Sequence, residues 1–270
     1  IYNNGNVIKC SMDFNENNMS KKNLLQNKRY ALILAGTSEM GGNIINDLIA
    51  QGYDVTFTWW KNNIKARGLE EKHGDYIKLR QLNLMDENSV IQFCKSIEKE
   101  NFDVTIYCAG ENPAILCDNL EPEIIKNTTW INFISATLIF NVIAKNMKEY
   151  KESETKFIYI SSVAAHKVNI GNSIYGATKI AMERYMSNIA LEFARFNLRT
   201  LCLSPGYIRT NMLKDYCDKK GITLRDIEKN IPTRQLLLPQ DIVNTINAFI
   251  NNQITTTGMT LTLGNGERLI

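Results

Sequence analysis

The sequence predicts an α/β fold, a doubly wound and mostly parallel sheet of seven strands with helices on both faces. Three observations predict it. Short apolar runs alternate with longer segments of helical apolar spacing from residue 30 onward. A glycine-rich turn joins the first apolar run to the first helical segment, and 270 residues with 44% hydrophobic content can bury one such core.

The apolar runs have the length and composition of strands, and helical segments separate them. The expected strands are 30–35, 55–59, 77–83, 104–108, 156–161, 200–204 and 259–263. The expected helices are 42–51, 87–100, 121–150, 175–196 and 239–251. Residues 211–232 are dense in charge and lie between the sixth strand and the last helix, so we expect a mobile lid that closes over the substrate.

Composition limits the remaining possibilities. Residues 1–27 are rich in Asn and Lys, which predicts a flexible tail or an expression remnant, and residues 28–270 are expected to form a single domain. A formal charge of +3 gives no reason to expect nucleic acid or a membrane as partner. The six cysteines lack metal-ligand spacing, which favours reduced thiols, a cytoplasmic location and no metal site.

The first glycine-rich turn reads Gly36-Thr37-Ser38-Glu39-Met40-Gly41-Gly42. Small residues there allow backbone N–H groups to approach a pyrophosphate at the positive end of a helix. Glycine is also the default for any tight strand-to-helix connection, so the turn alone does not decide. A carboxylate beside a pyrophosphate is repelled, and we expect Glu39 to turn outward or bond a local backbone N–H.

A second motif could transfer a proton. Tyr175 and Lys179 are four residues apart in a helical segment, which places the phenol and the ammonium on one helix face. Ser162 ends an apolar strand thirteen residues earlier. A phenol with a pKa near 10 needs a neighbouring cation to act as an acid at neutral pH. The alternatives are a solvated helix face for the pair and a simple turn for the serine.

These motifs, in this order, resemble the short-chain dehydrogenase/reductase family, and most of all the 3-oxoacyl-acyl-carrier-protein reductases. The resemblance spans roughly residues 29–266 and implies a Rossmann-type fold that binds a nicotinamide cofactor. The family usually reads Thr-Gly-x-x-x-Gly-x-Gly in the first turn. This turn is one residue shorter, with Glu39 at the place of the middle glycine.

The resemblance implies four catalytic residues. Tyr175 would donate the proton, Ser162 would polarise the substrate carbonyl, and Lys179 would lower the phenol pKa and hold the nicotinamide ribose. Asn132, in the middle of a helical segment, would bend the helix and hold a water that connects Lys179 to solvent. An exposed or capping asparagine is the alternative.

The cofactor site implied by the resemblance draws on the turn after each strand. Ala109-Gly110 is similar to the family's Asn-Asn-Ala-Gly, with Tyr107 and Cys108 in place of the asparagines, and Asn83 stands where an adenine-binding Asp is usual. Asp86 nearby could equally be a helix cap. The expected cofactor residues are Gly36, Ser38, Met40, Gly41, Trp60, Lys61, Asn83, Leu84, Ala109, Gly110, Lys179, Pro205, Gly206, Ile208 and Thr210.

The end of the second strand decides the choice of cofactor in these folds. It carries no carboxylate that would repel a 2′-phosphate, and Lys61, Thr58 and Asn62 offer a cation and hydrogen bonds, with Trp60 available for the adenine. We therefore expect NADP(H) to be preferred over NAD(H). A solvated lysine beside a surface aromatic is the alternative reading.

The expected activity is reduction of a ketone to a secondary alcohol, with a 3-oxoacyl thioester on a carrier protein as substrate. A free sugar, polyol or secondary metabolite is the alternative substrate, and a catalytically weak cofactor-binding scaffold is the alternative function. An acidic carrier could contact Lys145, Lys148, Lys151, Arg195 and Arg199. The resemblance also implies a homodimer or homotetramer built on the helices at 121–150 and 175–196.

Overall fold

The computed structural model describes residues 28–150 and 154–269, so the tail predicted for residues 1–27 lies outside the described residues. Seven parallel strands form one sheet in the order β3-β2-β1-β4-β5-β6-β7. Their bounds are β1 Arg29–Leu34, β2 Tyr53–Trp59, β3 Ile77–Gln81, β4 Val104–Tyr107, β5 Thr155–Ile160, β6 Leu198–Pro205 and β7 Met259–Leu263. The predicted fold class is confirmed.

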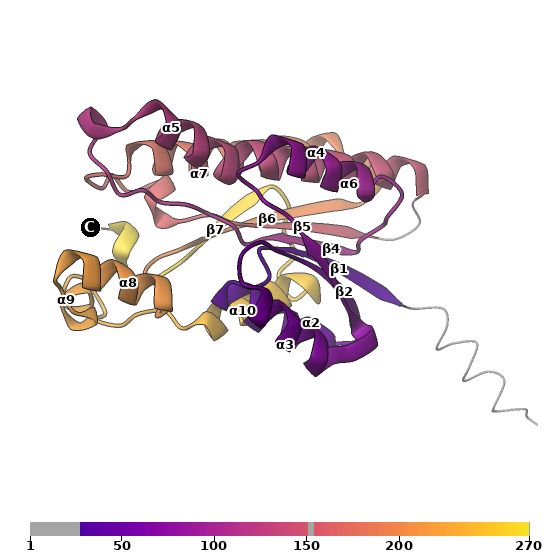
Figure 1. The fold of residues 1–270 in the computed structure, drawn as a ribbon, viewed down its shortest axis with the longest axis horizontal. Helices are drawn as coiled ribbons and strands as arrows, with labels where there is room; N and C mark the ends of the chain where they lie inside the picture. Colours follow the sequence, from indigo (N-terminus) through magenta and orange to yellow (C-terminus); the bar gives the residue numbers. More distant parts are fainter. Residues whose placement is uncertain (1–27, 151–153, 270) are drawn as a thin grey trace, which may run out of the picture.

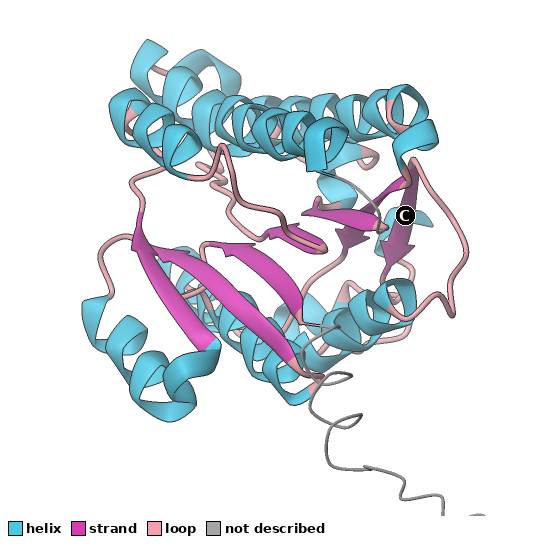
Figure 2. Ribbon diagram, turned by 90° about the vertical axis from the view of Figure 1, so that its right-hand side faces the viewer, coloured by secondary structure: helices cyan, strands magenta, loops and turns pink. Residues whose placement is uncertain are grey.

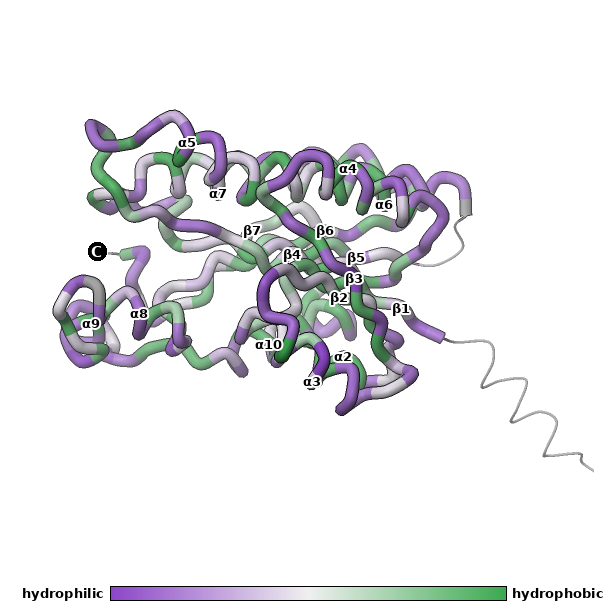
Figure 3. The backbone as a smooth tube through the Cα atoms, in the orientation of Figure 1, coloured by the Kyte–Doolittle hydropathy of each residue, from purple (hydrophilic) through white to green (hydrophobic). Residues whose placement is uncertain are grey.

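Helices cover both faces of the sheet (Figures 1 and 2). One face carries α2 (Glu39–Ala50), α3 (Asn63–His73) and α10 (Pro239–Ile250), and the other carries α4 (Glu87–Ser96), α5 (Pro122–Thr129), α6 (Ser135–Tyr150) and α7 (Ser173–Glu192). Successive residues of a strand point to opposite faces, so Ala31 and Ile33 join the first core while Leu32 and Leu34 join the second. Figure 3 shows apolar residues along the sheet and polar residues along the outer helices.

The structure differs from the helical prediction in two places. The segment expected as one helix at 121–150 is helical from Pro122 to Tyr150, but a π-helical turn, Trp130–Ile134, separates α5 from α6 at Asn132, the residue predicted to bend the helix. Helix α3 was not predicted, because it buries only Ala66 and Leu69 and so has little apolar periodicity.

The charged segment 211–232 contains two helices, α8 (Asn211–Lys220) and α9 (Leu224–Lys229), at one end of the molecule (Figure 1). Thr210 caps α8, and Thr223 and Asp226 form a capping box on α9. These helices bury a small core of their own, made of Leu213, Cys217, Ile227, Ile231 and Leu236. The segment is thus an ordered helical pair, and its closure over a substrate stays a prediction.

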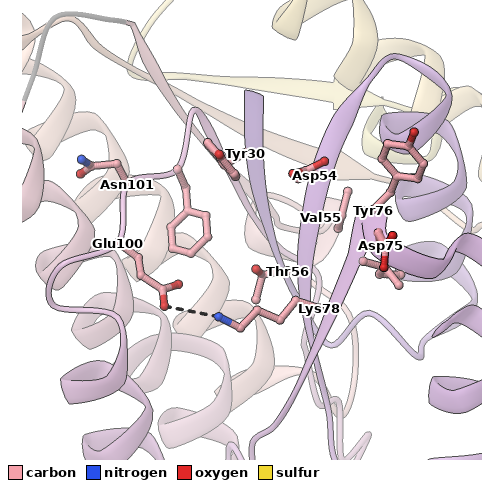
Figure 4. A pocket seen from close by; sticks show the side chains of 11 residues that line it. Tyr30, Asp54, Val55, Thr56, Asp75, Tyr76, Lys78, Glu100 and Asn101 are labelled. Atoms are coloured by element: carbon pink, nitrogen blue, oxygen red, sulfur yellow. Dashed lines mark ion pairs between the residues drawn. The ribbon is translucent and has the colours of Figure 1, made fainter. Parts of the chain in front are cut away.

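An open cavity of about 440 Å³ lies where β2 and β3 begin and where the chain enters β4. Its lining includes Tyr30, Asp54, Tyr76, Lys78 and Glu100 (Figure 4). Because all strands are parallel, this is the amino edge of the sheet, and the turns that carry the predicted site follow the opposite, carboxyl edge. This cavity is therefore separate from the candidate site.

Two further findings concern the cysteines and the helices. The five cysteines that the structure describes, Cys94, Cys108, Cys117, Cys202 and Cys217, are free thiols. Within residues 28–150 and 154–269, no helix combines the length and apolar content that crossing a bilayer requires.

Candidate active site

The predicted site residues gather along the carboxyl edge of the sheet. Each predicted group follows a different strand: Gly36 after β1, Trp60 after β2, Asn83 after β3, Gly110 after β4 and Ser162 after β5. The strand order changes direction between β1 and β4, because the chain moves outward from β1 to β3 and then returns to the other side of β1. Open α/β sheets bind ligands at such a switch point.

The glycine-rich turn is packed too tightly for side chains at two positions. A Cβ on Gly41 would lie 2.6 Å from the Ala35 carbonyl oxygen and 2.7 Å from the Gly36 Cα. A Cβ on Gly36 would lie 2.6 Å from the Phe57 ring. Ser38 caps α2 by accepting a hydrogen bond from the Gly41 N–H at 2.9 Å, so this turn leads directly into the positive end of a helix.

Strand β1 ends one residue earlier than predicted. Ala35 follows it with a φ of +61°, in the left-handed region that residues with a Cβ rarely adopt. The Gly36 N–H donates to the Thr58 carbonyl at 2.8 Å, which fastens the turn to β2. The early reversal at Ala35 accompanies a turn that is one residue shorter than the family's.

Glu39 is the first residue of α2, and its carboxylate turns toward α8. It accepts a hydrogen bond from the Asn211 N–H at 2.9 Å. The carboxylate does bond a backbone N–H, but one that is 172 residues away rather than local as predicted. The phosphate turn is therefore tied to the first residue of α8.

The end of β2 differs from the prediction in one respect. Thr58 is 1% exposed, and this burial keeps it from a phosphate. Its hydroxyl accepts from the Ala35 N–H at 2.9 Å and so holds the residue that follows β1. Asn62 caps α3 by accepting from the Lys65 N–H at 3.0 Å. Trp60 and Lys61 are exposed, as a role in cofactor binding requires.

Lys65 is a candidate cofactor residue that sequence reasoning missed. Its ammonium donates to the Ser38 carbonyl at 3.0 Å, which places a half-buried cation directly on the phosphate turn. A Cβ on Gly42 would lie 3.8 Å from this nitrogen. The sequence signal that could have revealed Lys65 is Asn62, a residue type that often caps helices. A helix that starts after Asn62 has Lys65 in its first turn.

Most polar groups in the turn after β3 form hydrogen bonds to other residues of this chain. The Asn83 carboxamide oxygen accepts from the Met85 N–H at 3.1 Å, and the Leu84 carbonyl accepts from the Ser135 hydroxyl at 3.1 Å. Asp86 caps α4 through the Asn88 N–H at 3.1 Å, which is the helix-cap alternative. The Asn83 amide nitrogen remains the group that could meet an adenine.

The side chains of Ser162 and Tyr175 lie near each other. Ser162 follows β5 and caps a short 3-10 turn, accepting from the Ala164 N–H at 3.2 Å, and Tyr175 lies in the first turn of α7. Burial raises the pKa of Tyr175, and the side-chain hydrogen bond from Ser162 opposes this rise. Gly176 permits the contact, because a Cβ there would lie 2.6 Å from the Ala164 carbonyl oxygen.

Lys179 is 2% exposed, and its ammonium donates to the Ile160 carbonyl at 2.8 Å. The nitrogen lies 4.6 Å from the Tyr159 ring centre and 5.6 Å from that of Tyr175. Burial lowers the pKa of Lys179 to about 7, because the charged form loses its hydration. Lys179 therefore exchanges a proton readily near neutral pH.

Asn132 is the central residue of the π-helical turn and is completely buried. Its side chain accepts from the Glu111 N–H at 2.8 Å, and donates to the Glu111 carbonyl at 2.9 Å and to the Thr178 hydroxyl at 3.0 Å. A Cβ on Gly110 would lie 3.0 Å from the Lys179 nitrogen and 3.7 Å from the Asn132 oxygen. Asn132 thus joins the turn after β4 to the helix that carries Lys179.

Two buried phenols support the π-helical turn. Tyr107 donates to the Ile131 carbonyl at 2.6 Å, and Tyr159 donates to the Asn132 carbonyl at 2.8 Å. A π-helical turn disturbs the regular pairing of carbonyls, and these two hydroxyls from β4 and β5 satisfy them. Sequence reasoning noted Tyr107 only as a replacement for asparagine, and it missed Tyr159.

The turn after β6 is held by several backbone bonds. The Gly206 N–H donates to the Leu263 carbonyl at 2.7 Å, and the Tyr207 N–H donates to the Glu267 carboxylate at 3.2 Å. Thr210 caps α8 by accepting from the Leu213 N–H at 3.3 Å. Pro205, Gly206, Ile208 and Thr210 are therefore presented on a fixed turn at the carboxyl edge.

The basic residues predicted to dock a carrier lie elsewhere. Lys145 and Lys148 are near the end of α6, and Arg195 and Arg199 are near the start of β6, so all four are at the amino edge. Arg199 is also paired with Glu154 at 2.6 Å. The predicted Lys151 lies outside the described residues.

The fold and this edge together define an oxidoreductase that uses a dinucleotide. The donor set fits such a group: the positive end of α2, the close-packed Gly41, the Lys65 ammonium and the buried Lys179. Glu39, an opposing charge on the phosphate turn, is bonded to α8. The fold is of a kind that binds nicotinamide cofactors.

The short chain dehydrogenase family matches residues 29–221, and the chain belongs to this family. The carbonyl reductase family member 4 of Xenopus laevis is 28% identical over 239 residues, covering 88% of this chain and 97% of that protein. The 3-oxoacyl-[acyl-carrier-protein] reductase FabG of Buchnera aphidicola is 25% identical over 248 residues, covering 90% and 99%. A 4-hydroxyisoleucine dehydrogenase complexed with NADH has a TM-score of 0.80 at 23% identity, covering 89% and 98%.

Proposed function

We propose that this oxidoreductase uses NADPH to reduce a ketone to a secondary alcohol at the carboxyl edge of the sheet. The observation that carries the proposal is the assembly of Ser162, Tyr175 and Lys179. The serine hydroxyl lies near the phenol and opposes the rise of its pKa, and the buried ammonium lies 5.6 Å from the phenol ring centre. A proton donor, a hydrogen-bond donor and an exchangeable cation are what carbonyl reduction requires beside a hydride source.

Each of these residues has a separate task. A bound nicotinamide cofactor supplies the hydride. Ser162 donates a hydrogen bond to the substrate oxygen, and Tyr175 gives its proton to that oxygen as negative charge develops. Lys179, whose pKa is about 7, exchanges protons at neutral pH and offers N–H donors to ribose hydroxyls. Asn132 keeps the turn after β4 against α7 and, as the family resemblance implies, serves the proton path to Lys179.

The preference for NADPH is supported by two cations near the end of β2. Lys61 is exposed beside Trp60, and Lys65 lies on the phosphate turn at 3.0 Å from the Ser38 carbonyl. A 2′-phosphate gains charge-assisted hydrogen bonds there that a 2′-hydroxyl cannot use fully. The similar dehydrogenase complexed with NADH shows that the fold by itself does not decide.

We expect kcat/KM to be higher with NADPH than with NADH. Lys61→Ala should lower this preference by a factor of about five, on the order of 1 kcal/mol, and Lys65→Met by about tenfold because its ammonium is already held on the turn. Affinity for adenosine 2′,5′-bisphosphate should fall in parallel, while affinity for AMP stays constant in Lys61→Ala. Arg67→Ala, on the exposed face of α3, is the control. Equal use of both cofactors by the parent enzyme would contradict the preference.

The proposed substrate is a 3-oxoacyl thioester on a carrier protein. The similarity to a 3-oxoacyl-[acyl-carrier-protein] reductase over 90% of this chain supports it. The basic residues on α6 and near the start of β6 lie at the amino edge, away from this site, and do not place the carrier. The proposed enzyme forms a homodimer or homotetramer through α5, α6 and α7, and its proposed location is the cytoplasm.

Steady-state oxidation of NADPH tests the substrate class. We expect kcat/KM for a 3-oxoacyl thioester to exceed that for free ketones and sugars, and that for polyols assayed with NADP+ in the reverse direction, by at least about tenfold, since the carrier-bound acyl group offers the most binding energy remote from the carbonyl. Faster turnover of a free ketone would favour the small-molecule alternative. No hydride transfer with any carbonyl, together with tight binding of NADPH, would favour the scaffold alternative.

A further inference from the structure

Glu183 is a buried carboxylate on the helix face that carries Tyr175 and Lys179. The three residues are spaced by four along α7, which places them in one row. Glu183 is 4% exposed, and the mechanism proposed above gives it no task. A buried carboxylate is costly unless hydrogen bonds compensate it, so its partners indicate what it does.

The Glu183 carboxylate has three side-chain partners on three different elements. One oxygen accepts a hydrogen bond from the Ser161 hydroxyl at the end of β5. The other lies 2.7 Å from His166 Nε2 and accepts from the Thr260 hydroxyl of β7 at 3.1 Å. These bonds connect α7 to the sheet and to the segment after β5.

Two of these partners, Ser161 and His166, flank Ser162 in the sequence. The segment 161–166 begins with Ser161 and ends with His166, and both side chains are fastened to the same carboxylate. Between them, the Ala164 carbonyl lies against Gly176. The position of the Ser162 hydroxyl relative to the Tyr175 phenol is therefore set by a carboxylate two helical turns beyond that phenol.

We propose that Glu183 is a positioning residue that holds the Ser162 hydroxyl in place beside the Tyr175 phenol. The inference rests on the role of Ser162 in the proposed function. It goes beyond that function because Glu183 acts through the segment 161–166 and touches neither substrate nor cofactor. Displacement by a fraction of an ångström is enough to cost a large factor in rate.

The first test compares three variants on the same helix. Glu183→Ala removes all three bonds, and we expect kcat to fall by about 10- to 100-fold with little change in NADPH affinity measured by fluorescence. Glu183→Gln keeps an acceptor for Ser161 and a donor for His166, and it should restore the rate to within about threefold of the parent. Ser187→Ala is the matched control, because Ser187 anchors the next turn of α7 to Gly258 at 2.7 Å, away from Ser162.

A double-mutant cycle separates positioning from general support of the fold. If Glu183 acts through Ser162, then Glu183→Ala should slow a Ser162→Ala enzyme by less than about twofold. Losses that multiply, or a parent-like rate in Glu183→Ala, would overturn the inference. A Glu183→Gln enzyme as slow as Glu183→Ala would also overturn the inference. The loss of rate would then come from the missing negative charge and not from the missing hydrogen bonds.

Two outcomes need separate readouts. A Ser162→Ala enzyme with the parent rate would overturn the proposed role of Ser162 and the inference with it, whereas a slow Ser162→Ala enzyme leaves the inference to be decided by the cycle. If circular dichroism shows that Glu183→Ala does not fold, His166→Ala takes its place in the cycle. That variant removes one bond from a partly exposed side chain, and it should lower kcat by about 3- to 10-fold with the same dependence on Ser162.

Discussion

The Tyr175→Phe variant is expected to turn over at least about 10²-fold more slowly than the parent enzyme, with nearly the same affinity for NADPH. The change removes the proton donor and leaves the ring, so packing beside Lys179 is kept. Burial raises the pKa of this phenol, so the proton is present at neutral pH, and its transfer depends on the nearby Lys179 ammonium. Single-turnover hydride transfer and cofactor titration measure the two quantities separately.

Tyr185→Phe is a matched control for this experiment. Tyr185 is on the same helix, and its hydroxyl bonds Asn141 on α6, ten residues and about 15 Å beyond Tyr175. The control should keep the parent rate. If Tyr175→Phe also kept most of its rate at saturating cofactor, the proton would have to come from Ser162 or from water.

The Gly41→Ala variant is expected to lose cofactor binding by at least about tenfold and to be less stable by about 1–3 kcal/mol. The new methyl group would lie within 3.0 Å of three backbone atoms of Ala35 and Gly36, which cannot move aside as a side chain would. The turn must therefore open, and its N–H groups no longer converge on a phosphate. Fluorescence titration and thermal unfolding report the two effects.

Gly68→Ala is the corresponding control in α3. A Cβ there meets nothing within 4 Å, so the substitution should leave cofactor binding unchanged and stabilise the helix by about 0.5–1 kcal/mol. Unaltered binding in Gly41→Ala would mean that the turn after β1 does not hold the phosphates.

Elements with a strong apolar pattern could be predicted, and weakly patterned ones could not. The strands and the long helices are buried on one or both faces, and their periodicity is visible in the sequence. Helices α3, α8 and α9 bury few side chains, and capping residues such as Asn62, Thr210 and Thr223 were their main signal. The failure to see α3 also concealed Lys65.

The motif residues of the site were predictable because their spacing along the chain is fixed. Ser162, Tyr175 and Lys179 lie together as the spacing indicated. Their supporting partners come from distant segments, so no local pattern marked them. Thr58 was available in the sequence as a phosphate ligand, but it is buried beneath the turn, where its hydroxyl accepts from the Ala35 N–H.

The bond between Glu39 and Asn211 makes binding at the two ends of the site interdependent. A dinucleotide that displaces the Glu39 carboxylate frees the first turn of α8, and a substrate that moves α8 frees the carboxylate. Thermodynamic linkage requires each ligand to change the affinity of the other by the same factor. If both ligands require this bond to open, they bind cooperatively. The ligand that binds first then loses the free energy needed to break the bond, and the second ligand does not. Because this coupling is reciprocal, either ligand gains the same factor in affinity once the other is bound, whichever of them binds first.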